Sequence, residues 1–144
     1  MLEALEEAKN EIRRADHLIF ISMRYARTCD VILNVIKKLM SSYDYCILAL
    51  LKKLEKDKKI KHVPASPMER AEFVDKHIKG AKSFIKQYKL FKKIVKCEYT
   101  SREEYKKNIT LITTEKKPIE ITVDVLKQYF ETTKEFIRFV EKYL

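Results

Sequence analysis

The sequence predicts a mainly α-helical fold, a four-helix bundle with a short β-hairpin before the last helix. Four segments carry apolar residues at alternating spacings of three and four, which places those residues on one stripe of a helix. The 144 residues include one Gly and three Pro, too few for the many tight turns of a sheet-dominated fold. One further segment carries apolar residues at every second position, as a half-buried strand does.

Two helices are predicted in the N-terminal part of the chain. The first covers residues 2–23, and its apolar stripe is Leu5, Ala8, Ile12, Ala15 and Ile19. The second covers residues 28–57, because Thr28 is a suitable N-cap and the stripe that follows continues to the Lys-rich run near residue 57.

A third helix is predicted over residues 67–97. Its start is marked by Ser66-Pro67-Met68-Glu69, a capping box with proline at the first helical position. Gly80 lies inside this segment and is expected to weaken the helix only locally, since the apolar stripe continues beyond it. The sequence therefore predicts one continuous helix here.

The C-terminal part of the chain predicts a hairpin followed by a helix. Alternating apolar residues on both sides of a polar five-residue segment place the hairpin at residues 108–122. Thr122 is the expected N-cap of a fourth helix over residues 123–143. We expect residues 1–144 to form a single domain, in which four amphipathic helices bury their stripes against one another. A helix face left unburied would favour a homodimer.

Composition narrows the function classes. The three cysteines have neither metal-ligand nor redox spacing, so we expect no disulfide framework and no metal site. The sequence contains no nucleotide-binding or hydrolase motif, so we expect no cofactor. The absence of a long apolar run predicts a protein with no membrane partner and a cytoplasmic location. Three Asn and two Gln beside 31 Lys and Arg are typical of a thermophilic source.

Positive charge is concentrated in one part of the chain. The net charge is +10; residues 58–65 carry +3 and residues 66–97 carry +6. Within the predicted third helix, six lysines follow spacings of three and four, which places them on one face, and no acidic residue lies between Asp75 and Glu98. This lysine row is Lys79, Lys82, Lys86, Lys89, Lys93 and Lys96.

Such a row predicts an association with RNA or another polyanion. Ammonium groups bind phosphates as point charges and release counterions, so binding would depend strongly on salt and weakly on sequence. The alternative interpretation is a solvated helix face that maintains solubility. The leading hypothesis is thus an RNA-associated bundle without catalytic activity.

Arg70 and His77 suggest a second hypothesis. They lie seven residues apart, two turns along the apolar side of the predicted helix. An Arg followed at this spacing by His resembles the motif of the HEPN superfamily, small helical bundles that often dimerise and in many cases cut RNA without a metal. The resemblance implies a metal-independent ribonuclease in which His77 acts as acid or base and Arg70 stabilises the phosphate. The alternative is that Arg70 lies in the first turn of a helix and that His77 is a core or interface histidine with a hydrogen-bond partner.

Two further basic clusters are interpreted as surface and loop charge. Arg13, Arg14 and His17 form one, and Arg24 and Arg27, with Tyr25 between them, form the other; no nucleophile or carboxylate pair supports a site at either. A third hypothesis, a protein-interaction or oligomerisation module, needs only the apolar stripes and no chemistry.

Overall fold

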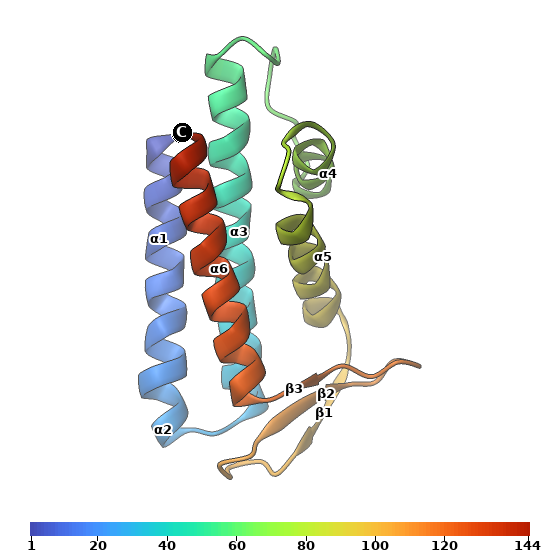
Figure 1. The fold of residues 1–144 in the computed structure, drawn as a ribbon. Helices are drawn as coiled ribbons and strands as arrows, with labels where there is room; N and C mark the ends of the chain where they lie inside the picture. Colours follow the sequence, from blue (N-terminus) through green and yellow to red (C-terminus); the bar gives the residue numbers. More distant parts are fainter.

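The computed structural model describes residues 1–144, and it confirms a mainly helical fold with a small antiparallel sheet at one end (Figure 1). Five helices have eleven residues or more. They are α1 (Leu2–His17), α3 (Cys29–Lys56), α4 (Pro67–His77), α5 (Lys82–Lys96) and α6 (Val123–Tyr143). The strands are β1 (Tyr99–Arg102), β2 (Thr110–Thr113) and β3 (Glu120–Ile121).

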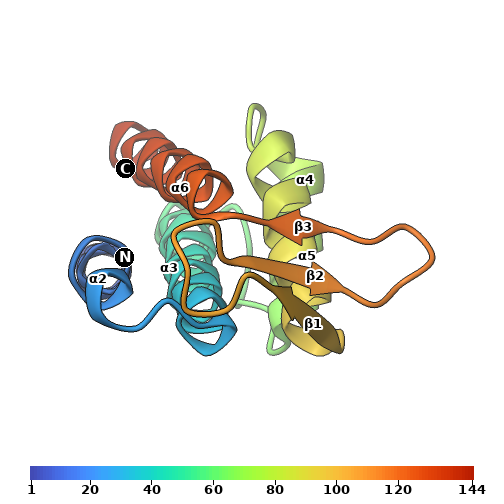
Figure 2. The same ribbon diagram turned by 90° about the horizontal axis from the view of Figure 1, so that it is seen from below.

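Three long helices, α1, α3 and α6, lie side by side and form the main bundle (Figures 1 and 2). The predicted helices at 28–57 and 123–143 are confirmed, and their N-caps are the expected ones. The Thr28 hydroxyl accepts a hydrogen bond from the Val31 amide at 3.3 Å, and Thr122 accepts one from the Val125 amide at 3.1 Å. No helix is both long and apolar enough to cross a bilayer.

The predicted helix at 2–23 is also present, but its last part is not a regular α-helix. After α1 the chain makes a π-helical turn, η1 (Leu18–Ser22), and then the short α2 (Met23–Tyr25). A π turn widens the helix by one residue and so rotates the side chains beyond it. Within this turn Ile19 is buried, whereas Phe20 and Ile21 are exposed.

The predicted continuous helix at 67–97 is wrong: the segment forms two helices, α4 and α5, so the fold has five helices of eleven residues or more where four were predicted. Ile78 is extended and Gly80 has φ +89°, a left-handed conformation that only glycine adopts without strain. The turn buries Ile78 and Ala81 in the core. Figure 1 shows the result, with α4 seen nearly along its axis and α5 running beside α3.

The predicted hairpin corresponds to β2 and β3, which pair antiparallel with Leu111 opposite Ile121. The sheet contains a third strand that was not predicted, β1, which pairs antiparallel with β2 and places Tyr99 opposite Thr113. Leu111 and Ile121 are buried beneath the helices, whereas three of the four residues of β1 are exposed. The sheet therefore closes one end of the bundle with one apolar face.

An aromatic cluster joins the main bundle to α5. The Tyr43 ring from α3 is fully buried, 4.9 Å from the ring of Phe136 in α6 and 5.3 Å from that of Phe91 in α5. Phe136 in turn stacks on Phe84 of α5 at 4.7 Å. Aromatic rings bury large apolar areas, so this cluster is a main source of stabilisation between the two parts.

Candidate nucleic-acid interface

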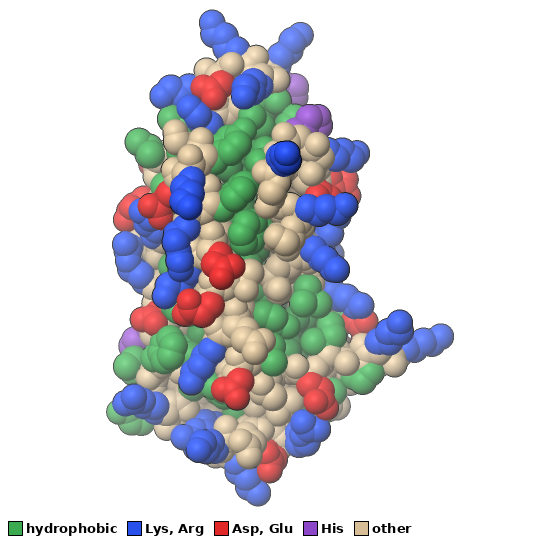
Figure 3. All heavy atoms as spheres, in the orientation of Figure 1, with side chains coloured by type: hydrophobic (Ala, Val, Ile, Leu, Met, Phe, Trp, Pro, Cys, Tyr) green, Lys and Arg blue, Asp and Glu red, His purple; other side chains and the backbone are tan.

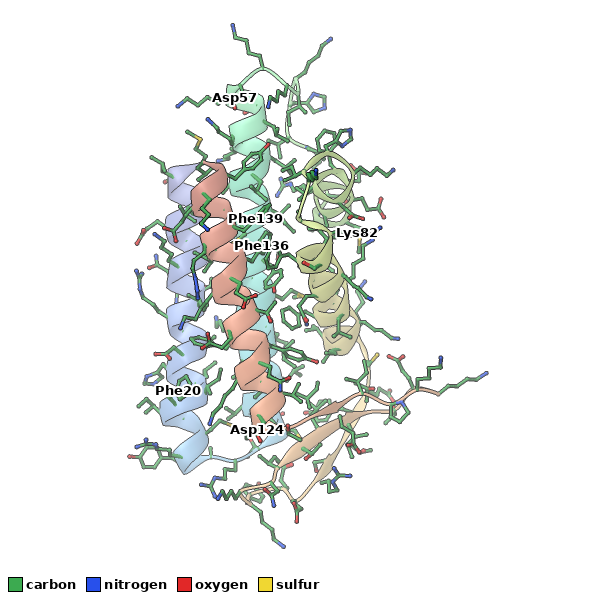
Figure 4. All side chains as sticks on the ribbon, viewed as in Figure 1. Phe20, Asp57, Lys82, Asp124, Phe136 and Phe139 are labelled. Carbon is green, nitrogen blue, oxygen red and sulfur yellow. The ribbon has the colours of Figure 1, made fainter.

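The amphipathic pattern of α5 places its lysines on the solvent side. Ile85, Tyr88, Phe91 and Ile94 are buried against the bundle. The opposite side carries five exposed lysines along about 21 Å of helix, at roughly 1.5 Å per residue. We call this surface the α5 lysine face; its members are Lys82, Lys86, Lys89, Lys93 and Lys96. Figure 3 shows Lys and Arg side chains along the edge formed by α4 and α5, and Figure 4 shows Lys82 pointing away from the bundle.

Lys79, the sixth member of the predicted row, is not on this face. It lies in the turn between α4 and α5, next to Gly80, and its side chain is exposed there. The helical spacing from which the row was predicted does not apply across that turn. The continuous row of six is therefore reduced to five lysines on one helix.

Four of the five ammonium groups on this face have no carboxylate within 4.0 Å. The exception is Lys93, whose Nζ lies 3.0 Å from Oε2 of Glu115 in the connection between β2 and β3. Hydrogen bonds from the Cys97 thiol and from Lys93 lower the pKa of Glu115, which keeps this carboxylate charged. Residues distant in sequence thus neutralise one lysine, and the face keeps most of its charge.

Arg70, one of the two residues proposed for catalysis, is turned toward the protein. Its Nε–H donates a hydrogen bond to the Pro64 carbonyl at 2.6 Å, and the side chain is only partly exposed. Burial raises the pKa of the Asp44 carboxyl of α3, and the positive charge of Arg70 opposes part of that rise. Arg70 therefore fastens the start of α4 to the preceding loop and faces α3.

Asp44 is a residue of α3, and its carboxyl group contacts α5. The Tyr88 hydroxyl donates a hydrogen bond to its Oδ1, and Lys92 Nζ lies 5.4 Å from the centre of the Tyr88 ring. Burial raises the pKa of Asp44, and this outweighs the opposing effects of the Tyr88 hydrogen bond and of the Lys92 and Arg70 charges. The contact links two helices through a carboxyl group that retains its proton to a higher pH than usual.

His77, the second proposed catalytic residue, is the last residue of α4 and is exposed, which corrects its placement on an apolar face. Its ring stacks on Phe73 with the ring centres 4.0 Å apart, and Nδ1 lies 3.0 Å from the Phe73 carbonyl oxygen. No hydrogen bond joins His77 to Arg70, and the two lie about 10 Å apart along the helix axis at 1.5 Å per residue. The structure does not bring these two side chains together.

Of the other clusters singled out in the sequence, one lies in the last turns of α1 and the other lies in α2 and directly after it. Arg14 pairs with Glu11, and Arg13 pairs with Glu6 at 3.6 Å, so both carry local carboxylate partners. Arg24 and Arg27 have no such partner. They lie beside Lys107 and Lys127, which come from distant parts of the chain, and together these four line a hollow. Sequence spacing contained no signal for this grouping, because three separate segments contribute to it.

No group of three His, Cys, Asp or Glu side chains is placed so that it could hold a metal ion. Compared with known proteins, the chain matches no family model, no curated protein and no solved structure.

Proposed function

We propose that this protein binds RNA through the α5 lysine face and does so without catalysing a reaction. The observation that carries the proposal is a set of four exposed lysines, Lys82, Lys86, Lys89 and Lys96, that no carboxylate neutralises. Like charges three and four residues apart cost a helix a few tenths of a kcal/mol per pair, and interspersed Glu would remove that cost. A phosphate backbone laid along the helix would offset the repulsion and release its counterions.

The experiment is an RNA titration at several salt concentrations with the triple variant Lys82→Glu/Lys86→Glu/Lys89→Glu. Three phosphate contacts contribute about 2 to the slope of log affinity against log salt for a single strand. The variant should therefore bind more weakly and lose about that much of the slope.

A matched control separates the position of the charge from its amount. Lys37, Lys52 and Lys142 are exposed and belong to no ion pair, so reversing these three changes the net charge equally. The control should retain clearly more affinity than the α5 variant. Equal losses in the two triple variants would reject the proposal in favour of non-specific attraction.

The ribonuclease suggested by the HEPN resemblance stays a prediction, and the same preparation tests it. RNA would be incubated with the protein in the presence of a chelator, and the products compared with those of His77→Ala. Cleavage that is lost in His77→Ala would support the ribonuclease and reject a purely non-catalytic role. Cleavage that survives the substitution would eliminate the mechanism that uses His77.

A further inference from the structure

A hollow of about 260 Å³ lies at the sheet end of the molecule, away from the α5 lysine face. It is formed where η1 and α2, the connection between β1 and β2, and the start of α6 meet. Four cationic and four apolar side chains line it, and the apolar ones include Phe20. We call this site the basic hollow; its cations are Arg24, Arg27, Lys107 and Lys127. Figure 2 looks onto this end, where the β1–β2 connection lies over the N-terminal end of α3 and beside the start of α6.

The segments that form the basic hollow are fastened to one another. The Tyr105 amide donates a hydrogen bond to the Arg27 carbonyl at 2.7 Å, which holds the β1–β2 connection against the chain between α2 and α3. A second link is made by Glu104, whose Oε1 accepts from the Cys29 amide at 3.1 Å. One backbone hydrogen bond and one side-chain hydrogen bond thus hold the connection that carries Lys107 beside the segment that carries Arg27.

The four cations of the basic hollow form no ion pair within the protein. None of its four cations lies within 4.0 Å of a carboxylate, and no acidic residue is among its lining side chains. The adjoining hollow shares Lys107 and Lys127 with this one, and there Glu103 and Asp124 are also present, while Arg102 pairs with Glu120 at 3.1 Å. Arg24 and Arg27 line only the basic hollow. Four cations that form no ion pair, around a concave surface with no acidic lining residue, favour an anionic ligand.

The apolar lining of the basic hollow includes an aromatic ring. Phe20 lies in the π turn η1 and is 40% exposed, although its ring also meets Phe130 edge-on at 5.9 Å. Lys127 Nζ lies 5.9 Å from the centre of the Phe20 ring. Single-turn π segments occur frequently at functional sites, and this one places an apolar ring beside the cations. Figure 4 shows Phe20 and Asp124 at the same end of the bundle, on neighbouring elements.

Unpaired cations next to an exposed ring match the chemistry of a nucleotide within a single strand. Proteins that bind single strands combine a positively charged surface for the backbone with aromatic side chains on which bases stack. The hollow is smaller than the roughly 300–1,000 Å³ of sites that enclose a whole small ligand. It would therefore receive part of a polymer, one base and its phosphate, more readily than a complete cofactor.

We propose that the basic hollow binds one nucleotide of single-stranded RNA, with its base against Phe20 and its phosphate among Arg24, Arg27, Lys107 and Lys127. This inference rests on the proposed RNA binding and adds to it a second contact and a preference for unpaired strands. A base inside a duplex is stacked on its neighbours and cannot reach the ring, whereas the α5 lysine face contacts only phosphates.

The test uses the double variant Arg24→Glu/Lys107→Glu and a fluorescent single-stranded oligouridylate of roughly 12 nucleotides, within the usual site sizes. Both residues are exposed and belong to no ion pair, so the fold should tolerate the change. Affinity should fall at least roughly tenfold below that of Lys37→Glu/Lys52→Glu, and the salt slope should fall by about 1.4. Affinity for a duplex of the same length should fall less.

A second variant separates stacking from charge. Phe20→Leu keeps an apolar side chain but removes the ring, and loss of one base stack should weaken binding by about tenfold without changing the salt slope. Thermal unfolding of Phe20→Leu shows whether the contact with Phe130 is needed for folding. If that variant is unstable, the charge-reversal variant decides alone.

The outcomes distinguish this inference from the proposed function. Loss of binding in the α5 triple variant, with Arg24→Glu/Lys107→Glu matching its control, would overturn the basic hollow and leave the proposed function standing. Wild-type protein that binds no RNA would overturn both. Equal losses on single strands and duplexes would overturn the nucleotide site. The nucleotide site would also be overturned if Arg24→Glu/Lys107→Glu lost binding to phosphatidylserine vesicles and kept its binding to RNA. That result would assign the hollow to a lipid headgroup.

Discussion

The main bundle and the α4–α5 unit each bury a long apolar stripe, but they do so with different helix geometry. In the bundle, α3 continues without interruption for 28 residues and packs against both α1 and α6. The α4–α5 unit, residues 67–96, also has 30 residues with apolar side chains at helical spacing. It nevertheless turns sharply at Gly80 and packs against α3 as two short helices. A continuous apolar stripe in the sequence therefore does not ensure a continuous helix. Whether the helix continues depends on which parts of the fold can bury each end of the stripe.

The largest effect is expected where the two units meet. Phe136 is fully buried between Tyr43 of α3 and Phe84 of α5, so Phe136→Ala removes a ring from both contacts at once. We expect the free energy of unfolding to fall by about 3–5 kcal/mol, the usual range for truncating a buried Phe. Urea unfolding followed by circular dichroism measures it. Phe136→Leu should lose clearly less, and a loss below about 1 kcal/mol in Phe136→Ala would show that α5 is not held through this ring.

A smaller loss is expected at the turn itself. Gly80→Ala places a Cβ at φ +89° and 3.3 Å from Cε2 of Phe139, so both backbone and packing are strained. The expected loss is about 1–3 kcal/mol. Introducing Phe139→Leu in the same chain should recover only part of it, because the backbone strain stays. If Gly80→Ala were instead stabilising, the α4–α5 unit would be one helix in solution.

The start of α4 is expected to depend on its cap. The Ser66 hydroxyl accepts a hydrogen bond from the Glu69 amide at 3.2 Å, and Ser66→Ala leaves that amide without this partner. We expect a loss of about 1 kcal/mol. Ser66→Asp, which keeps an acceptor at the same position, serves as the control and should stay close to wild type. An unchanged melting temperature in Ser66→Ala would mean that packing alone fixes the beginning of α4.

The smallest effect concerns pH and the link between the two units. Burial raises the pKa of Asp44 above its ordinary 3.8, so the folded state binds a proton more tightly than the unfolded state. Stability from this group is therefore fully present below pH 3.8 and is lost as pH rises through the folded-state pKa. Asp44→Asn still accepts from the Tyr88 hydroxyl and does not titrate.

Unfolding measured from pH 3 upward should therefore show wild type losing stability relative to Asp44→Asn as the pH increases. A difference between the two proteins that is independent of pH would indicate that water solvates Asp44 in both states. A difference of the opposite sign would mean that the Arg70 and Lys92 charges dominate over burial at this carboxyl.

The sequence was sufficient for the main bundle because local signals and tertiary packing agree there. Thr28 and Thr122 cap the helices that their positions predict, and the apolar stripes of those helices are buried. At Gly80 the signals disagree: a glycine weakens a helix interior by only about 1 kcal/mol, which the buried stripe on both sides was expected to offset. The burial of Ile78 and Ala81 in the turn reverses that balance and is visible only in three dimensions.

The strand β1 and the basic hollow were not predicted, because no local sequence pattern indicates either of them. The edge strand β1 exposes three of its four residues, so its sequence lacks the alternation by which β2 and β3 were recognised. The α5 lysines were predictable because a helical period connects them. Lys107 and Lys127 are some 80 to 100 residues from Arg24 and Arg27, and no period connects segments that only the fold brings together.

The three cysteines have a practical consequence for studying these surfaces. Cys29 and Cys46 are buried, and burial raises the pKa of Cys29 to about 12, so under native conditions both should resist maleimide reagents. Cys97 is partly exposed at the end of α5, beside the lysine face, although its hydrogen bond to Glu115 raises the pKa of its thiol. In mildly alkaline buffer a maleimide fluorophore should therefore attach at Cys97. Its fluorescence would report ligand contact on α5, and no cysteine has to be introduced or removed by mutation.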